Sequence, residues 1–102
     1  MVHDRVTRIS VLKVPVDIVE PDDLEEVVKA MYSDGKNHQI VLLSAADLMR
    51  ARRSGEFRTM IAGASLVVPI SMSIVRAAKF LKRRAPVRYE PFDFIVRLLS
   101  IL

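Results

Sequence analysis

Hydroxyl side chains follow the two most apolar runs of the chain, at positions where ligand chemistry is expected. The first run, Gln39–Leu43, stops at Ser44, and the second, Leu66–Val68, is followed after a proline by Ser71 and Ser73. In open α/β sheets, ligands bind just beyond the carboxyl ends of the strands. Neither junction contains an acid, a histidine or a glycine. These residue types alone therefore do not define a reaction.

Other groups that could carry chemistry are few. A Ser–His–acid arrangement would need His3 or His38, and His38 is expected to lie in a loop before a strand with only a local hydrogen bond. Four carboxylates crowd one helix start, where they are typical of capping charge rather than of a metal site: Asp22, Asp23, Glu25 and Glu26. The chain has neither cysteine nor a glycine-rich phosphate loop. We therefore expect no metal and no cofactor.

Length and composition predict a single globular domain over residues 1–102, with 51% hydrophobic and 27% charged residues. The N-terminal residues lack the apolar core of a signal peptide, and no run approaches the ~20 apolar residues that span a bilayer. A cytoplasmic location is the default expectation. The absence of cysteine, with a single asparagine and a single glutamine, favours a thermophilic source.

Charge is unevenly distributed along the chain. Residues 1–49 contain nine acids and five Lys or Arg, which gives −4, whereas residues 50–102 contain three acids and eleven Lys or Arg, which gives +8. A basic face is expected near the C-terminal end: Arg76, Lys79, Lys82, Arg83, Arg84 and Arg88. This face lacks the interleaved aromatic residues that stack on bases, so we expect no nucleic acid. Anionic lipid or a nucleotide diphosphate is the alternative ligand.

The order of elements predicts an α/β fold with a small open, mostly parallel sheet and helices on both faces, similar to a Rossmann arrangement. Residues 5–19 alternate loosely, which predicts a bent strand or hairpin with a turn near Lys13. Pro21 starts a helix that Gly35 ends, and Ser44 and Ser54 cap two further helices. Several residues are expected on the buried faces of the helices: Leu48, Met49, Phe57, Met60, Ile61, Ile74, Val75, Ala78 and Leu81.

The last helix, which Pro91 starts, is apolar nearly all round. Its one polar stripe is formed by Asp93, Arg97 and Ser100 at spacings i, i+4 and i+7. A short chain has little material to cover such a helix, which favours contact with another subunit over contact with a membrane surface. The alternative is that the chain's own strands cover it. The expected interface residues are Phe92, Phe94, Ile95, Leu98, Leu99 and Leu102.

Five segments in this order resemble the N-terminal half of the WecG/TagA/CpsF family of bacterial glycosyltransferases, over about residues 9–97. The first segment, Val11–Asp17, is similar to I-L-G-V-P-V-D with Lys13 at the turn glycine, and the second, His38–Ala46, is similar to H-x-V-V-T-x-N-P-E. The third, Arg50–Arg58, is similar to A-R-x-D-P-E-F-R. The fourth, Leu66–Lys79, is similar to L-V-x-P-D-G-x-G-x-V-x-A-A-K, and the fifth, Arg88–Asp93, is similar to R-V-T-G-x-D.

The resemblance implies transfer of an N-acetylhexosamine-type sugar from a UDP donor to a lipid-linked acceptor. It further implies that the Asp of P-D-G is a general base or positions the acceptor, and that the Thr and Asn of T-x-N line the pocket. In this sequence the acid position is Ile70, the T-x-N positions are Leu42 and Ser44, and two of the glycines are Ser71 and Ser73. Isoleucine cannot accept a proton, and side chains at glycine positions fill the space for a ligand.

These replacements lead to the interpretation of a truncated, non-catalytic relative that binds a copy of itself or another protein. The first alternative is one half of a split UDP-sugar-dependent transferase that acts only with a second chain. The second alternative is a module whose basic face binds anionic lipid or a nucleotide diphosphate.

Overall fold

The chain begins with a β-hairpin, and the computed structural model describes residues 4–102. Strands β1 (Thr7–Val11) and β2 (Val14–Ile18) pair antiparallel, with Val11 opposite Val14. The two turn residues, Leu12 and Lys13, have φ of 50° and 72°, the left-handed conformation that tight hairpin turns require. The hairpin and its turn near Lys13 are as the sequence predicts.

Helix α1 (Pro21–Ser33) begins where the sequence places it, with proline in its first turn. Its buried stripe is formed by Leu24, Val27, Val28 and Met31, at the spacing of an amphipathic helix. The chain leaves the helix through Gly35, whose φ of 72° suits a residue without Cβ.

Strands β3 (Ile40–Leu43) and β4 (Leu66–Pro69) form a parallel pair in which Leu43 lies opposite Pro69. One face of this pair, with Val41, Leu43 and Val67, packs in the same hydrophobic cluster as the hairpin and the helices of the middle of the chain. The other face, with Leu42 and Val68, packs with α1 and the last helix. Because strand side chains alternate between faces, burial on both sides explains why these strands are apolar throughout.

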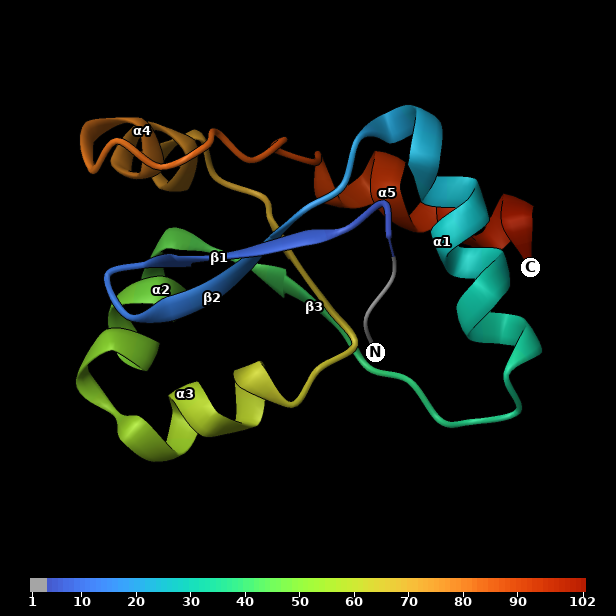
Figure 1. Ribbon diagram of the computed structural model, residues 1–102, viewed down its shortest axis with the longest axis horizontal. Coiled ribbons are helices and arrows are strands. Elements are labelled where there is room, and N and C mark those ends of the chain that lie inside the picture. The colour runs from blue at the N-terminus through green and yellow to red at the C-terminus, as the bar shows by residue number, and fades with distance from the viewer. Residues whose placement is uncertain (1–3) are drawn as a thin grey trace.

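Within residues 4–102, five helices pack around the two pairs of strands (Figure 1). Helices α2 (Ala45–Arg53), α3 (Gly55–Ala62) and α4 (Met72–Phe80) lie on the side of the hairpin, whereas α1 and α5 (Pro91–Ile101) lie together on the other side. This arrangement confirms the α/β class, the helices on both faces and the N-terminal hairpin, with a parallel sheet of two strands.

Three helix residues lie further out than the sequence predicts. Met49 is 38% exposed, Met60 is 54% exposed and Leu81 is 39% exposed. Helices α2 and α3 are short, so each buries a narrow stripe, and the neighbouring Ala51 and Ile61 occupy it. Leu81 follows the last residue of α4 and is therefore outside the helical periodicity.

Candidate functional site

The two hydroxyl-bearing junctions lie side by side in the structure. The amide of Ile70 donates a hydrogen bond of 3.0 Å to the carbonyl of Leu43, which continues the parallel ladder one step past β4. Ser44 and Ser71 therefore begin α2 and α4 at the same end of the β3–β4 pair, which we call the carboxyl edge. This is the place where an open α/β sheet binds ligands.

The hydroxyls at the carboxyl edge are used as helix caps. Ser44 Oγ accepts a hydrogen bond from the amide of Asp47 at 3.1 Å. Ser71 Oγ accepts one from the amide of Ser73 at 3.2 Å and donates to Ser73 Oγ at 3.1 Å. Each bond satisfies an amide that the first turn of a helix leaves without a partner. These serines can bind polar groups, but within residues 4–102 none of their side chains is hydrogen-bonded to a carboxylate or a histidine that would activate it as a nucleophile.

The two other positions that the resemblance assigns to this edge, Leu42 and Ile70, carry no titratable group. Leu42 packs into the hydrophobic cluster shared with α1 and α5. Ile70 is half-buried, and its carbonyl accepts a hydrogen bond of 3.0 Å from Arg88 Nε. Arg88 therefore belongs to the carboxyl edge rather than to a continuous basic face along α4.

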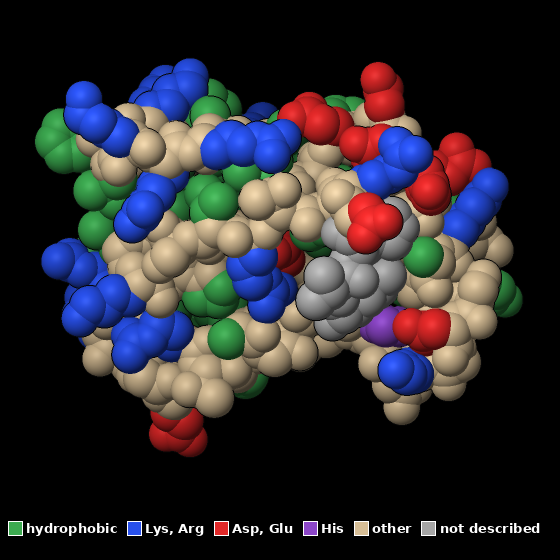
Figure 2. Space-filling model, viewed as in Figure 1, with side chains coloured by type: hydrophobic (Ala, Val, Ile, Leu, Met, Phe, Trp, Pro, Cys, Tyr) green, Lys and Arg blue, Asp and Glu red, His purple; other side chains and the backbone are tan. Residues whose placement is uncertain are grey.

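The other members of the predicted basic face are all exposed. Arg76 and Lys79 lie on α4, and the three consecutive residues Lys82, Arg83 and Arg84 lie in the connection that follows it. Arg84 Nη1 lies 3.4 Å from the hydroxyl of Thr7. Figure 2 shows Lys and Arg side chains gathered over α4 and α2, with acidic side chains gathered over α1. The charge asymmetry of the sequence is therefore also an asymmetry in space.

The six residues expected to form an interface on α5 divide into two groups. Phe92, Ile95, Leu99 and Leu102 are between 46% and 70% exposed, and Val96 joins them at 47%. Phe94 is only 2% exposed, with its ring 5.3 Å from that of Tyr89. Leu98 packs against the same cluster. This placement corrects the expectation for Phe94 and Leu98, which belong to the chain's own core.

An ion pair that the sequence reasoning missed connects the hairpin to β4. The carboxylate of Asp17, 1% exposed, accepts hydrogen bonds from Arg8 Nε at 2.7 Å, from Arg8 Nη2 at 2.9 Å and from the amide of Val67 at 2.7 Å. Arg8 also donates to the carbonyls of Ala62 and Ala64. The bond to the carboxylate raises the pKa of the Arg8 guanidinium. We call the side of β4 that faces β2 the lateral edge.

A hydrogen-bonded Ser–His–Asp series occurs at the opposite end of the parallel pair. His38 Nδ1 lies 2.7 Å from Ser65 Oγ, and His38 Nε2 lies 2.8 Å from the Asp34 carboxylate. The bond from His38 lowers the pKa of Asp34. The amides of Ser65 and Leu66 both donate to the carbonyl of Gln39, so they cannot stabilise an oxyanion. The bond to Asp34 is the local contact expected of His38, whereas the bond to Ser65 joins it to a second, distant loop. His3 lies outside the described residues.

Acids on α1 are also occupied by ion pairs. Arg5 contacts Asp23 at 2.8 Å and Glu26 at 2.9 Å, and Lys29 contacts Glu25 at 2.8 Å. Over residues 4–102, acids and histidines do not assemble into a group of three or more that could hold a metal ion. Within the same residues, no helix combines the length and hydrophobicity needed to cross a bilayer.

Two cavities lie away from the carboxyl edge. One, of about 500 Å³, is between the hairpin and α3. The other, of about 530 Å³, is between the C-terminal parts of α1 and α5 and is mostly apolar. His38 reaches the second cavity, whereas its partner Ser65 is not among the lining residues. A substrate in that cavity would therefore meet the histidine but not the serine.

Comparison with models of known protein families identifies a family for the chain. The sequence model of the glycosyl transferase WecG/TagA/CpsF family matches residues 9–102, which is nearly the whole chain. No curated protein matches the chain.

Proposed function

Because the chain belongs to the WecG/TagA/CpsF family of glycosyl transferases, we propose that it is a non-catalytic member that binds a second copy of itself through the outer face of α5. The outer face is defined by its exposed apolar side chains: Phe92, Ile95, Val96, Leu99 and Leu102. This face is the observation that carries the proposal.

The replacement of the implied acid by Ile70 supports a non-catalytic role. Transfer of a sugar to a hydroxyl requires a group that removes the hydroxyl proton. The family resemblance places this acid at the position of Ile70, and the adjacent Ser44 and Ser71 are used as helix caps. The described His38 lies at the other end of the parallel pair, too far along the strands to replace the acid.

The spacing of the outer face supports association with another helix. Phe92, Ile95, Leu99 and Leu102 are separated by three, four and three residues, the pattern of the first and fourth positions of a coiled-coil heptad. In an antiparallel pair of such helices, Phe92 of one copy meets Leu102 of the other, and Ile95 meets Leu99. The outer face of one copy can therefore be covered by the same face of the other copy, as a two-fold symmetric interface requires.

The expected energy of covering the outer face is comparable with the cost of association. Complete burial of a large aliphatic or aromatic side chain contributes about 1.5–3 kcal/mol, so a half-exposed one gains about 1 kcal/mol on being covered. Five such residues on each copy give about 10 kcal/mol, which lies within the estimated 4–15 kcal/mol cost of association. The dimer is therefore expected to depend on concentration.

Native mass spectrometry and light scattering across a concentration series test this proposal. Ile95→Glu together with Leu99→Glu should leave a folded monomer, because both side chains are exposed in the single chain. Ser100→Glu is the control for an added carboxylate, since it places one such charge on the polar stripe of α5 and should leave the dimer intact. A wild-type monomer at all concentrations, or a dimer that the double variant leaves unchanged, would overturn the proposal.

The split-transferase alternative predicts a different result from the same measurement. Protein drawn gently from its own cells would then contain a second, different chain in a fixed ratio. That complex should turn over a UDP-sugar. If the Ile95→Glu, Leu99→Glu variant loses both the complex and the turnover, the outer face is the surface that binds the second chain. A complex without turnover would leave association as the function of the face.

A further inference from the structure

We propose that the cavity between the hairpin and α3 binds a phosphoryl group, such as that of a small phosphorylated ligand. The cavity has a volume of about 500 Å³, which is within the range of small-molecule sites. Three cations line it, namely Arg8, Lys13 and Arg58, together with the hydroxyls of Ser10 and Thr59 and without any acid in the lining. This site is distinct from the carboxyl edge and from the outer face of α5.

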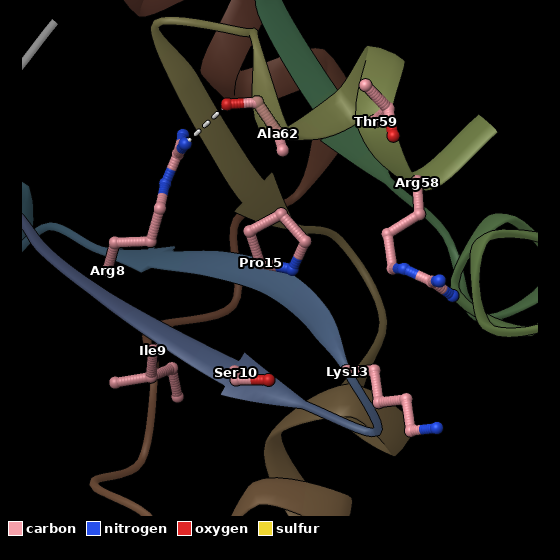
Figure 3. Close-up of a pocket in the computed structure, with 8 residues that line it drawn as sticks. All are labelled: Arg8, Ile9, Ser10, Lys13, Pro15, Arg58, Thr59 and Ala62. Atoms are coloured by element: carbon pink, nitrogen blue, oxygen red, sulfur yellow. Dashed lines mark hydrogen bonds between the residues drawn. The ribbon is translucent and has the colours of Figure 1, made fainter. Parts of the chain in front are cut away.

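The net charge of the lining is positive because only one of the three cations has a carboxylate partner. Arg8 is paired with Asp17, so these two charges offset each other. Lys13 and Arg58 make no ion pair with the described residues. Figure 3 shows Lys13 and Arg58 at the same end of the cavity, with Arg8 at the other end. Two neighbouring cations without an acid favour binding of an anion between them.

The Arg58 side chain is held in place with donors to spare. Its Nη1 donates to the carbonyls of Ala51 and Arg52 at 3.1 and 3.2 Å, which fixes the guanidinium against the C-terminal end of α2. Its Nε and Nη2 make no hydrogen bond to the described residues. A guanidinium that is positioned by one nitrogen and open at the other two can donate two parallel bonds to a phosphoryl group.

The hairpin turn determines where the Lys13 side chain leaves the backbone. The φ of Lys13, 72°, is a conformation that side chains other than glycine and asparagine rarely adopt. The neighbouring Leu12, at φ 50°, packs against the hydrophobic core, and this packing offsets its strain. The Lys13 side chain makes no hydrogen bond or ion pair within residues 4–102 that would offset its own strain. Its ammonium group therefore lines the cavity without a partner among these residues and is available to an anion.

A pair of lysine-to-glycine variants separates this site from general positive charge. Lys13→Gly removes the cation and suits the left-handed turn, so the fold is retained. Lys82→Gly is the matched control, because Lys82 has φ of 60°, is exposed and lies after α4 on a different surface. Both variants remove one positive charge and relieve the same kind of backbone strain. A difference in anion affinity between the two variants therefore shows which of the two lysines lies beside the bound anion.

The experiment is titration of the wild-type chain and both variants with inorganic phosphate and with pyrophosphate, followed by two-dimensional NMR and calorimetry. Saturable shifts at the hairpin turn and in α3 are expected, with binding weakened about tenfold in Lys13→Gly, as for loss of one charge-assisted hydrogen bond, and unchanged in Lys82→Gly. Linear shifts without saturation, or equal weakening in both variants, would overturn the proposal.

Vesicles that contain phosphatidic acid distinguish the source of the phosphoryl group. Saturable binding of free phosphate or pyrophosphate assigns the site to a soluble ligand. Vesicle binding that Lys13→Gly weakens and Lys82→Gly does not, without binding of the free anions, assigns the same site to a lipid headgroup. Vesicle binding that only Lys82→Gly weakens would place the anion on the surface after α4 and contradict the proposal.

Discussion

At the lateral edge of β4, Asp17 is 1% exposed and its carboxylate accepts three hydrogen bonds, from Arg8 and from the amide of Val67. At the carboxyl edge of the same strand, the position that the family resemblance assigns to a catalytic acid is Ile70, half-buried beside two capping serines. Asp17, the acid within the fold, is present, whereas Ile70 stands where the resemblance implies an acid at the carboxyl edge. The two edges therefore contrast an acid that the fold itself uses with an acid position that the resemblance implies and this sequence does not keep.

The physical roles of the two positions explain this difference. The lateral edge of β4 has no strand partner, so the amide of Val67 would be buried without an acceptor if Asp17 were absent. The carboxyl edge contains helix starts whose amides can be satisfied by serine hydroxyls. We therefore expect an acid to contribute more to folding at the first position than at the second.

The largest expected effect is the loss of Asp17. Asp17→Ala leaves the Arg8 guanidinium and the Val67 amide without their acceptor, and we expect the free energy of unfolding to fall by about 3–5 kcal/mol. Asp17→Asn retains the shape and one acceptor and should cost less, about 1–3 kcal/mol. Urea unfolding followed by circular dichroism measures both. If Asp17→Ala lowers the free energy of unfolding by less than an average core substitution does, the hairpin is held to β4 by apolar packing alone.

The converse substitution tests the carboxyl edge. Ile70→Asp restores the acid that the resemblance implies, and we expect a cost of about 1 kcal/mol, typical of a single substitution at a partly buried position. Arg88 donates to the carbonyl of residue 70 and lies close enough to offset the new charge. Ile70→Asn is the neutral control, and at pH 7 it should be no more stable than Ile70→Asp. A cost equal to that of Asp17→Ala would remove the contrast between the two edges.

Much of the fold follows directly from the sequence. Pro21 starts α1 and Ser44 and Ser54 cap α2 and α3, because proline and serine at these positions satisfy local requirements of the helix start. Strands without polar alternation predict burial on both faces, and the two hydrophobic clusters on either side of β3 and β4 confirm it. These inferences need only neighbouring residues and one periodicity.

Contacts between distant residues were not predictable in the same way. Asp17 is a lone acid in an apolar strand, a pattern that indicates a buried charge, but its partner amide at Val67 is 50 positions away. His38 and Asp34 are four residues apart, whereas Ser65 is 27 positions further along the chain. A single sequence contains no information on which distant groups meet, so the residue types could be recognised and their partners could not.

The orientation of α5 was unpredictable for a different reason. The helix is apolar nearly all round, so its periodicity does not distinguish the side that meets the core from the side that meets solvent. Phe94 and Leu98 pack inward, whereas Ile95 and Leu99, each one position later, are exposed. The inward and outward sides therefore differ by the rotation of one residue about the helix axis. Tyr89 settles the orientation, because its ring meets Phe94 and its hydroxyl donates to the carbonyl of Val19 at 2.7 Å.

The smallest expected effect extends the comparison to an exposed carboxylate. The hydrogen bond from His38 lowers the pKa of Asp34 in the folded chain below its ordinary value of 3.8. A lowered pKa stabilises the fold above the unfolded value, and this contribution is lost as the pH falls through the folded value. The carboxyl carbon of Asp34, followed by NMR from pH 6 to pH 2, should therefore titrate below pH 3.8 in the wild-type chain, and its midpoint should move toward pH 3.8 in His38→Ala.

Because Asp34 is exposed, His38→Ala should change stability far less than Asp17→Ala. An equal loss of stability would mean that the two loops joined by His38 matter to the fold as much as the lateral edge does.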